Sequence, residues 1–107
     1  SIATPQLVTA VPDGAGVFAL SRGLPNPFER SVAFTLVLPI RGPADFALYD
    51  VQGRRVRTLL AGEQPAGARR VAWNGLDDEG RPVAAGIYLA RLRVADAERV
   101  RRVVRLR

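Results

Sequence analysis

The acidic residues that stand closest together in the sequence are Asp77, Asp78 and Glu79, and Gly80 follows them. Clustered carboxylates in a loop are the ligands that calcium prefers. A calcium loop of the EF-hand type, however, spaces its ligands at alternating positions over about twelve residues. Here the acidic run ends at once, because Arg81 comes next. Asp and Gly are also the residues that form tight turns. We therefore predict a metal-free turn at residues 77–80, and no cofactor.

Several side chains that enzymes commonly use are absent from the whole sequence. The chain contains no cysteine, histidine, methionine or lysine. This composition excludes thiol nucleophiles, metal sites built from Cys and His, Ser-His-acid triads and Schiff bases. No glycine-rich run matches a phosphate-binding loop, and no pair of carboxylates has a spacing that indicates hydrolysis. We predict that the protein is not an enzyme.

The basic residues are of a single type. All 16 are arginine, and the net charge is +6. Because guanidinium groups fit carboxylates and phosphates, one interpretation is an anionic partner such as an acidic glycan. The other interpretation is a solvated surface encoded by a GC-rich genome, which favours arginine over lysine. This interpretation explains the complete lack of lysine better. We do not expect specific binding of nucleic acid.

Seven of the arginines lie between residues 87 and 107, near the C-terminus. Residues 87–94 and 99–106 are typical of two strands in a hairpin that closes at residues 96–98. The side chains predicted to face the core are Tyr88, Leu92, Val94, Val100, Val104 and Leu106. The candidate interaction surface is the opposite face, with Arg91, Arg93, Arg99, Arg101, Arg105 and Arg107. Alternatively, these charges only keep an exposed sheet edge from pairing with other chains.

The rest of the chain shows the same period of two. Alternating apolar runs recur roughly every eight to twelve residues between Gly, Pro and Asp, which favours an all-β sandwich or barrel without helices. Further strands are predicted at residues 32–38, 46–51, 54–60 and 69–73, with a Gly/Pro loop at 62–67. Gly53 should adopt a positive φ in a tight hairpin turn. We predict that Trp73 is buried in the core beside Phe34, Leu48 and Tyr88.

Residues 1–22 differ from the rest and are predicted to be an arm or linker in front of a domain at residues 23–107. Ordering a residue costs roughly 1–2 kcal/mol of backbone entropy, so an ordered arm must pack on something. We expect residues 17–20 to pair within the same domain, and residues 6–11 to be able to add a strand to another copy. The candidate strand-exchange residues are Leu7, Val8, Val11, Phe18 and Leu20.

A series of short motifs resembles two known families. In chain order the motifs are GLPNPF at 23–28, LYDVQGR at 48–54, VAWNG at 71–75, DDEGRPV at 77–83 and AGIY at 85–88. The series resembles the C-terminal sorting domains of type IX secretion substrates. From Tyr49 to Leu92 it is also similar to the immunoglobulin-like domain of flagellar hook-capping proteins. The resemblance implies an immunoglobulin-like β-sandwich of about seven antiparallel strands, without catalytic activity, in an exported protein.

Three functional hypotheses follow from the residues and the resemblance together. The first is a module for secretion sorting and cell-surface attachment, whose partner is the secretion machinery or a surface component. The second is a self-assembling fibre or surface-layer subunit that binds other copies through its arm. The third is a structural domain like that of the hook-capping proteins. An anionic glycan is a further candidate partner. We expect an extracellular or cell-surface location and no membrane span, because no apolar run approaches about 18 residues.

Overall fold

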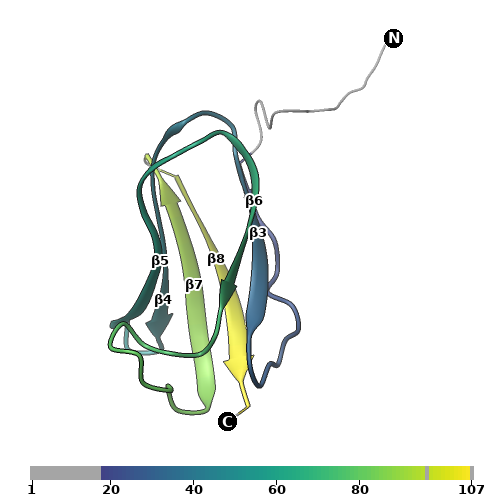
Figure 1. The fold of residues 1–107 in the computed structure, drawn as a ribbon, viewed down its shortest axis with the longest axis vertical. Coiled ribbons are helices and arrows are strands. Elements are labelled where there is room, and N and C mark those ends of the chain that lie inside the picture. The colour runs from purple at the N-terminus through teal and green to yellow at the C-terminus, as the bar shows by residue number, and fades with distance from the viewer. Residues whose placement is uncertain (1–17, 96, 107) are drawn as a thin grey trace.

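Two antiparallel β-sheets face each other in the computed structural model, which describes residues 18–95 and 97–106 (Figure 1). One sheet has three strands in the order β2-β3-β6, and the other has four in the order β5-β4-β7-β8. The strands are β2 (Ala19–Leu20), β3 (Val32–Leu38), β4 (Gly42–Asp50), β5 (Arg55–Gln64), β6 (Gly67–Trp73), β7 (Gly86–Val94) and β8 (Ala97–Arg105). The predicted sandwich of about seven antiparallel strands is confirmed, and no helix occurs in the described ranges.

The strands begin and end partly outside the predicted ranges. The alternation in β3 holds as expected, since Val32, Phe34, Leu36 and Leu38 are buried. In contrast, β4 and β5 stay paired as far as Gly42 opposite Gln64. The Gly/Pro loop predicted at 62–67 is therefore too long, because β5 continues to Gln64 and β6 begins at Gly67, which leaves only residues 65–66 between the two strands. Cross-strand pairing overrides the low strand propensity of glycine and proline at this end of the sheet.

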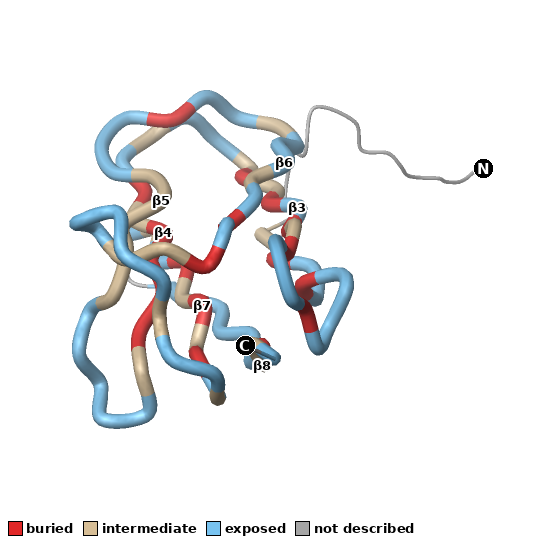
Figure 2. The backbone as a smooth tube through the Cα atoms, turned by 60° about the horizontal axis from the view of Figure 1, so that its bottom comes forward, coloured by how far each residue is buried: buried red, intermediate tan, exposed pale blue. Residues whose placement is uncertain are grey.

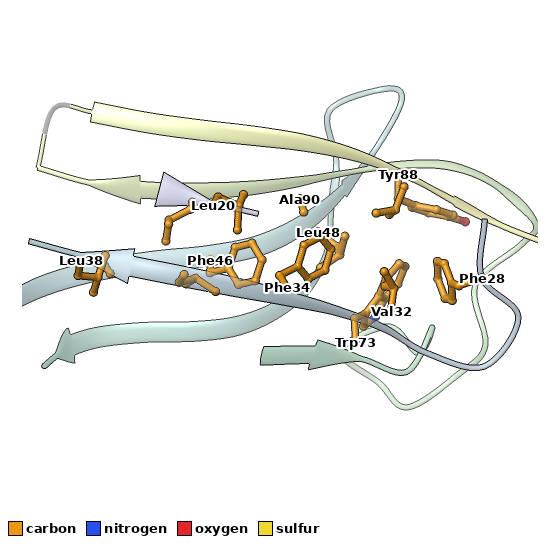
Figure 3. Packing of buried hydrophobic residues seen from close by; sticks show 14 residues of the cluster. Leu20, Phe28, Val32, Phe34, Leu38, Phe46, Leu48, Trp73, Tyr88 and Ala90 are labelled. Atoms are coloured by element: carbon orange, nitrogen blue, oxygen red, sulfur yellow. The ribbon is translucent and has the colours of Figure 1, made fainter. Parts of the chain in front are cut away.

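The core lies between the sheets and is centred on aromatic rings (Figure 3). The predicted burial of Trp73 and its position beside Tyr88 are confirmed, since the Trp73 side chain is fully buried. Its ring centroid lies 5.4 Å from that of Tyr88 and 5.5 Å from that of Phe28. Phe34 belongs to the same cluster, as does Leu48. Figure 2 shows that the buried residues recur along the strands, whereas the loops at both ends are mostly exposed.

Side chains and backbone together define the two hairpin turns. Asp50 Oδ1 accepts hydrogen bonds from the N–H groups of Gln52 (2.9 Å) and Arg54 (3.0 Å). Gly53 has φ 86°, which confirms the predicted positive value.

The last hairpin, between β7 and β8, is tighter than predicted, because Val94 already lies opposite Ala97. Its predicted closure at residues 96–98 is wrong, although Asp96 itself lies outside the described residues.

The end of the predicted arm is part of the sandwich. Ala19 lies opposite Val37 and Leu20 opposite Leu36, so β2 pairs with β3 in the same domain, as expected. Leu20 is only 1% exposed, and Phe18 packs partly buried against the core. The other candidate strand-exchange residues, Leu7, Val8 and Val11, lie outside the described residues.

Candidate functional site

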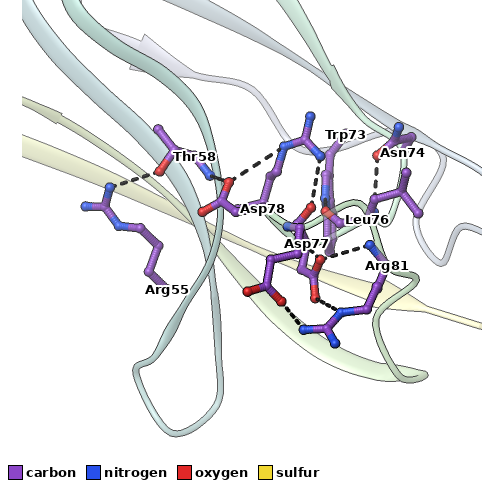
Figure 4. Close-up of polar contacts among 10 residues, drawn as sticks. Arg55, Thr58, Trp73, Asn74, Leu76, Asp77, Asp78 and Arg81 are labelled. Atoms are coloured by element: carbon purple, nitrogen blue, oxygen red, sulfur yellow. Dashed lines mark hydrogen bonds and ion pairs between the residues drawn. The ribbon is translucent and has the colours of Figure 1, made fainter.

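Residues 77–80 form the predicted turn (Figure 4). Asp77 Oδ1 accepts hydrogen bonds from the N–H groups of Glu79 and Arg81, both at 2.9 Å, and the Gly80 N–H donates to the Asp77 carbonyl. Gly80 has φ 81°, a value that glycine adopts without strain. The carboxylate oxygen that a cation would need is thus engaged by the backbone. Within the described ranges, no group of three or more His, Cys, Asp or Glu side chains is placed to hold a metal ion.

This turn also covers the free edge of β5, a role that sequence reasoning missed. The Thr58 N–H donates to Asp78 Oδ1, and the Asp78 N–H donates to the Val56 carbonyl, both at 3.0 Å. Arg57 Nη1 donates to the Asp77 carbonyl at 3.2 Å. The turn therefore supplies the partners that a further strand would supply, which protects the edge from pairing with other chains.

The acidic turn makes stability depend on pH. The backbone hydrogen bond from Arg81 is the main cause that holds the pKa of Asp77 below its ordinary value of 3.8. A carboxyl group whose pKa is lowered by folding stabilises the protein above its unfolded pKa, and this contribution is lost as the pH falls through the folded pKa. Asp50 behaves in the same way, mainly because of the backbone hydrogen bond from Arg54.

Replacing Asp77 by Asn should therefore flatten the acid limb of the stability profile. Asparagine keeps an oxygen that accepts the two backbone hydrogen bonds, but it does not titrate. We expect the parent to lose stability below about pH 4, and Asp77→Asn to lose less, in urea titrations down to about pH 2.5. Glu29→Gln is the control, because it removes one exposed carboxylate elsewhere. Equal acid limbs for Asp77→Asn and the parent would contradict this role of the turn.

The arginines of the predicted interaction surface do not share one face. Residues directly opposite each other on paired strands point to the same side of a sheet. Arg99 lies opposite the buried Leu92, Arg101 opposite the buried Ala90, and Arg105 opposite Gly86. These three arginines are therefore on the core side of β8, whereas Arg91 and Arg93 are on the outer side.

The expectation of a common face is wrong because the hairpin closes earlier than predicted. An odd shift in register moves every side chain of a strand to the other face. Val103 takes the core position on β8 and is fully buried, while Val100 is 41% and Leu106 45% exposed. Arg107 lies outside the described residues.

The arginines on the core side of β8 hold the segment that precedes β3. Arg101 Nε donates a hydrogen bond of 2.7 Å to the Leu20 carbonyl in β2. The guanidinium group of Arg99 lies 4.6 Å from the centroid of the Phe18 ring. These contacts join β2 to β8 across the open side of the sandwich. They assign a structural role to residues that the sequence offered as an interaction surface.

A second edge is closed by the side chain of Asn26, which sequence reasoning also missed. Asn26 Nδ2 donates to the Arg102 carbonyl at 3.0 Å, and Asn26 Oδ1 accepts from the Val104 N–H at 2.9 Å. Phe28 continues the pairing, since its N–H donates to the Val104 carbonyl and its carbonyl accepts from the Leu106 N–H. The signal in the sequence was an amide side chain between two prolines, which have no N–H to offer a neighbouring strand.

Asn26→Ala should therefore destabilise the fold and open the edge of β8. The loss of two hydrogen bonds is expected to cost about 1–2 kcal/mol in urea unfolding. Hydrogen exchange of the Val104 amide should become faster. Asn26→Asp is the matched variant, because it keeps the acceptor for Val104 but not the donor for Arg102, so its effect should be intermediate. Unchanged exchange at Val104 in Asn26→Ala would show that the side chain does not close this edge.

A cleft of about 410 Å³ lies beside the acidic turn. Each charged side chain of its lining has an ion-pair partner, either within the lining, as in Asp50–Arg54 (3.0 Å), or just outside it, as in Asp77–Arg81 (3.7 Å). The Tyr88 hydroxyl donates a 2.6 Å hydrogen bond to the Ala84 carbonyl, and burial raises its pKa. The hydroxyl therefore stays protonated at neutral pH. Nothing in the described lining of the cleft pairs a nucleophile with a general base.

The two facing sheets and their strand order define an immunoglobulin-like β-sandwich. Residues 28–98 match the family model of the FlgD Ig-like domain, and the chain belongs to this family. The resemblance to the hook-capping domain is thereby confirmed, and solved structures with this fold come from a hook-capping protein and from a type IX secretion component, the two systems that the sequence resembles.

Two of these solved structures share the fold at low sequence identity. FlgD of Xanthomonas campestris, which acts in the hook capping essential for flagellar assembly, is 23% identical, with a TM-score of 0.55 over 85% of this chain and 68% of its own. PorZ of Porphyromonas gingivalis, an essential bacterial surface component of the type IX secretion system, is 19% identical, with a TM-score of 0.54 over 84% of this chain. The match spans only 11% of PorZ. None of the curated proteins matches the chain.

No helix long and apolar enough to cross a membrane occurs in the part of the chain that the structure describes.

Proposed function

We propose that the chain is a non-catalytic module of an exported protein, and that it acts in secretion sorting and attachment at the cell surface. The observation that carries the proposal is that the motifs resembling sorting domains close the two edges of the four-stranded sheet. The motif at 23–28 closes the edge of β8 through Asn26, and the motif at 77–83 closes the edge of β5 through Asp78. These residues serve to build a sandwich with closed edges, which suits a structural module.

The comparisons support the same class of function. The family match and the fold of FlgD and PorZ agree with a role as a structural or secretion module. The partner in this proposal is a component of the secretion machinery or of the cell surface. The comparisons do not favour the fibre-subunit hypothesis, which stays a prediction because it depends on arm residues outside the described ranges.

A secretion reporter tests the sorting role. The full 107-residue chain would be fused to the C-terminus of an exported fluorescent protein and expressed in a bacterium that has a type IX system. We expect the reporter at the cell surface in the parent strain and in the periplasm of a strain without the translocon. The same reporter carrying the FlgD domain is the control for a fold without a sorting role. Equal distributions of our reporter in the two strains would contradict the proposal.

A further inference from the structure

The side of the four-stranded sheet that faces away from the core carries an ordered group of arginines around one tyrosine. Tyr49 lies opposite Arg55 on β5 and opposite Leu89 on β7, and Leu89 in turn lies opposite Arg102 on β8. Tyr49 is outside the core cluster that includes its neighbour Leu48, which places its ring on the other side of the sheet. We call this side the outer face and define it by Tyr49, Arg55, Leu89, Arg91, Arg93 and Arg102.

Two guanidinium groups lie against the tyrosine ring. Arg91 is 4.6 Å and Arg55 5.6 Å from the ring centroid, and Tyr49 is only 8% exposed although it faces outward. Arg55 Nη2 also donates hydrogen bonds of 3.1 Å to the Tyr49 hydroxyl and to Asp45 Oδ2. A guanidinium group that packs on an aromatic ring keeps donors in its own plane for a carboxylate, and its orientation is already fixed.

The charge of the outer face is incompletely balanced. Arg91 Nε and Arg93 Nε lie 3.9 Å and 3.8 Å from the same oxygen of Glu98, beyond hydrogen-bond distance. The side chains of Arg91 and Arg93 are 37% and 56% exposed. Among the described residues the Arg102 side chain has no ion pair. Two carboxylates thus stand among the four arginines of the outer face, Asp45 paired with Arg55 and Glu98 between Arg91 and Arg93, and donors of Arg91 and Arg93 remain available to an anion.

We propose that the outer face binds an acidic surface of another protein. Arginine and tyrosine are enriched where proteins bind each other, and here they stand beside exposed apolar side chains such as Val100 (41%) and Ile87 (42%). A sugar ring would need an open aromatic face, whereas the face of Tyr49 is covered by arginines. A second copy docked face to face would bring like charges together, which opposes association.

The outer face differs from the surface that the sequence indicated. It retains Arg91 and Arg93 from the six predicted arginines, and it adds Tyr49, Arg55 and Arg102. The proposal concerns binding alone and goes beyond the sorting role, so it holds whether or not the chain directs a passenger to the cell surface.

An amide NMR titration with a synthetic peptide of alternating Glu and Val residues tests the proposal at low salt. We expect shifts in β4, β7 and β8, and a Kd that rises as salt screens the charges. Arg91→Gln with Arg93→Gln should weaken binding about tenfold or more. The control is Arg30→Gln with Arg70→Gln, which makes the same change in net charge at exposed positions off the outer face. Thermal melts verify that both double variants fold.

Three outcomes would overturn the proposal. Equal weakening in the two double variants would show that only net charge matters. The absence of peptide-induced shifts on the outer face would show that this face is not the site. Tighter binding of a sulfated oligosaccharide or of duplex DNA at the same amides would assign the face to a different class of partner.

Discussion

Trp73→Ala is expected to lower the free energy of unfolding by about 3–5 kcal/mol, the cost of removing a large buried side chain. Trp73 is fully buried, and its ring packs against those of Phe28 and Tyr88 (Figure 3). Its Nε1 also donates a 2.8 Å hydrogen bond to the Leu76 carbonyl, which fixes the start of the loop after β6. Urea unfolding measures the loss, and the Tm should fall by more than about 10 °C.

Trp73→Phe separates packing from hydrogen bonding. This variant keeps an aromatic ring in the core but leaves the Leu76 carbonyl without its donor. We expect a smaller loss, of about 1–3 kcal/mol. Melting of Trp73→Ala within a degree or two of the parent would contradict the position of the residue at the centre of the core.

Gly23→Ala should have the second largest effect, roughly 3 kcal/mol, at the upper end of the usual range for overpacking a core. Gly23 is buried where the chain enters the sandwich. A Cβ at this position would lie 2.7 Å from Val32 Cγ2, 2.8 Å from Phe34 Cε2 and 2.9 Å from Val103 Cγ1. All three side chains belong to the close-packed core and have little room to move.

Gly42→Ala is the matched control for this glycine. A Cβ at Gly42 would meet nothing within 4 Å, so the change should alter stability by less than about 0.5 kcal/mol. Both variants are compared by urea unfolding under the same conditions. Equal stability of Gly23→Ala and Gly42→Ala would contradict the close packing of the Gly23 backbone against Val32, Phe34 and Val103.

Strand pattern could be predicted from the sequence, whereas register could not. The alternation in β3 places its apolar side chains correctly, because an isolated run with a period of two has one apolar face. The run in β8 is different, since both Val103 and Val104 are apolar and either could face the core. Turn length decides between them, and an early turn after Val94 moves Arg99 and Arg101 to the core side.

The edge contacts of the candidate site could be predicted only in part. The turn at residues 77–80 follows from local rules, because Asp77 bonds to the backbone of its own loop. That Asp78 then bonds to Thr58, and that Asn26 bonds to Val104, depends on segments brought together by the whole fold. Pairing over a separation of 78 residues has no signal in the local sequence.

The hydrogen bonds between residues 26–28 and β8 should make the domain resist being pulled apart along the direction of these strands. Phe28 and Arg105 run parallel, so a pull on the two ends of the chain, once it has released β2, loads the hydrogen bonds of this pair in shear. The four bonds made by Asn26 and Phe28 then carry the load together, whereas strands pulled apart from one end lose their bonds one at a time. We expect Asn26→Ala to lower the rupture force in single-molecule pulling between the termini. A domain that tethers a protein to a cell surface under flow would carry tension along this line.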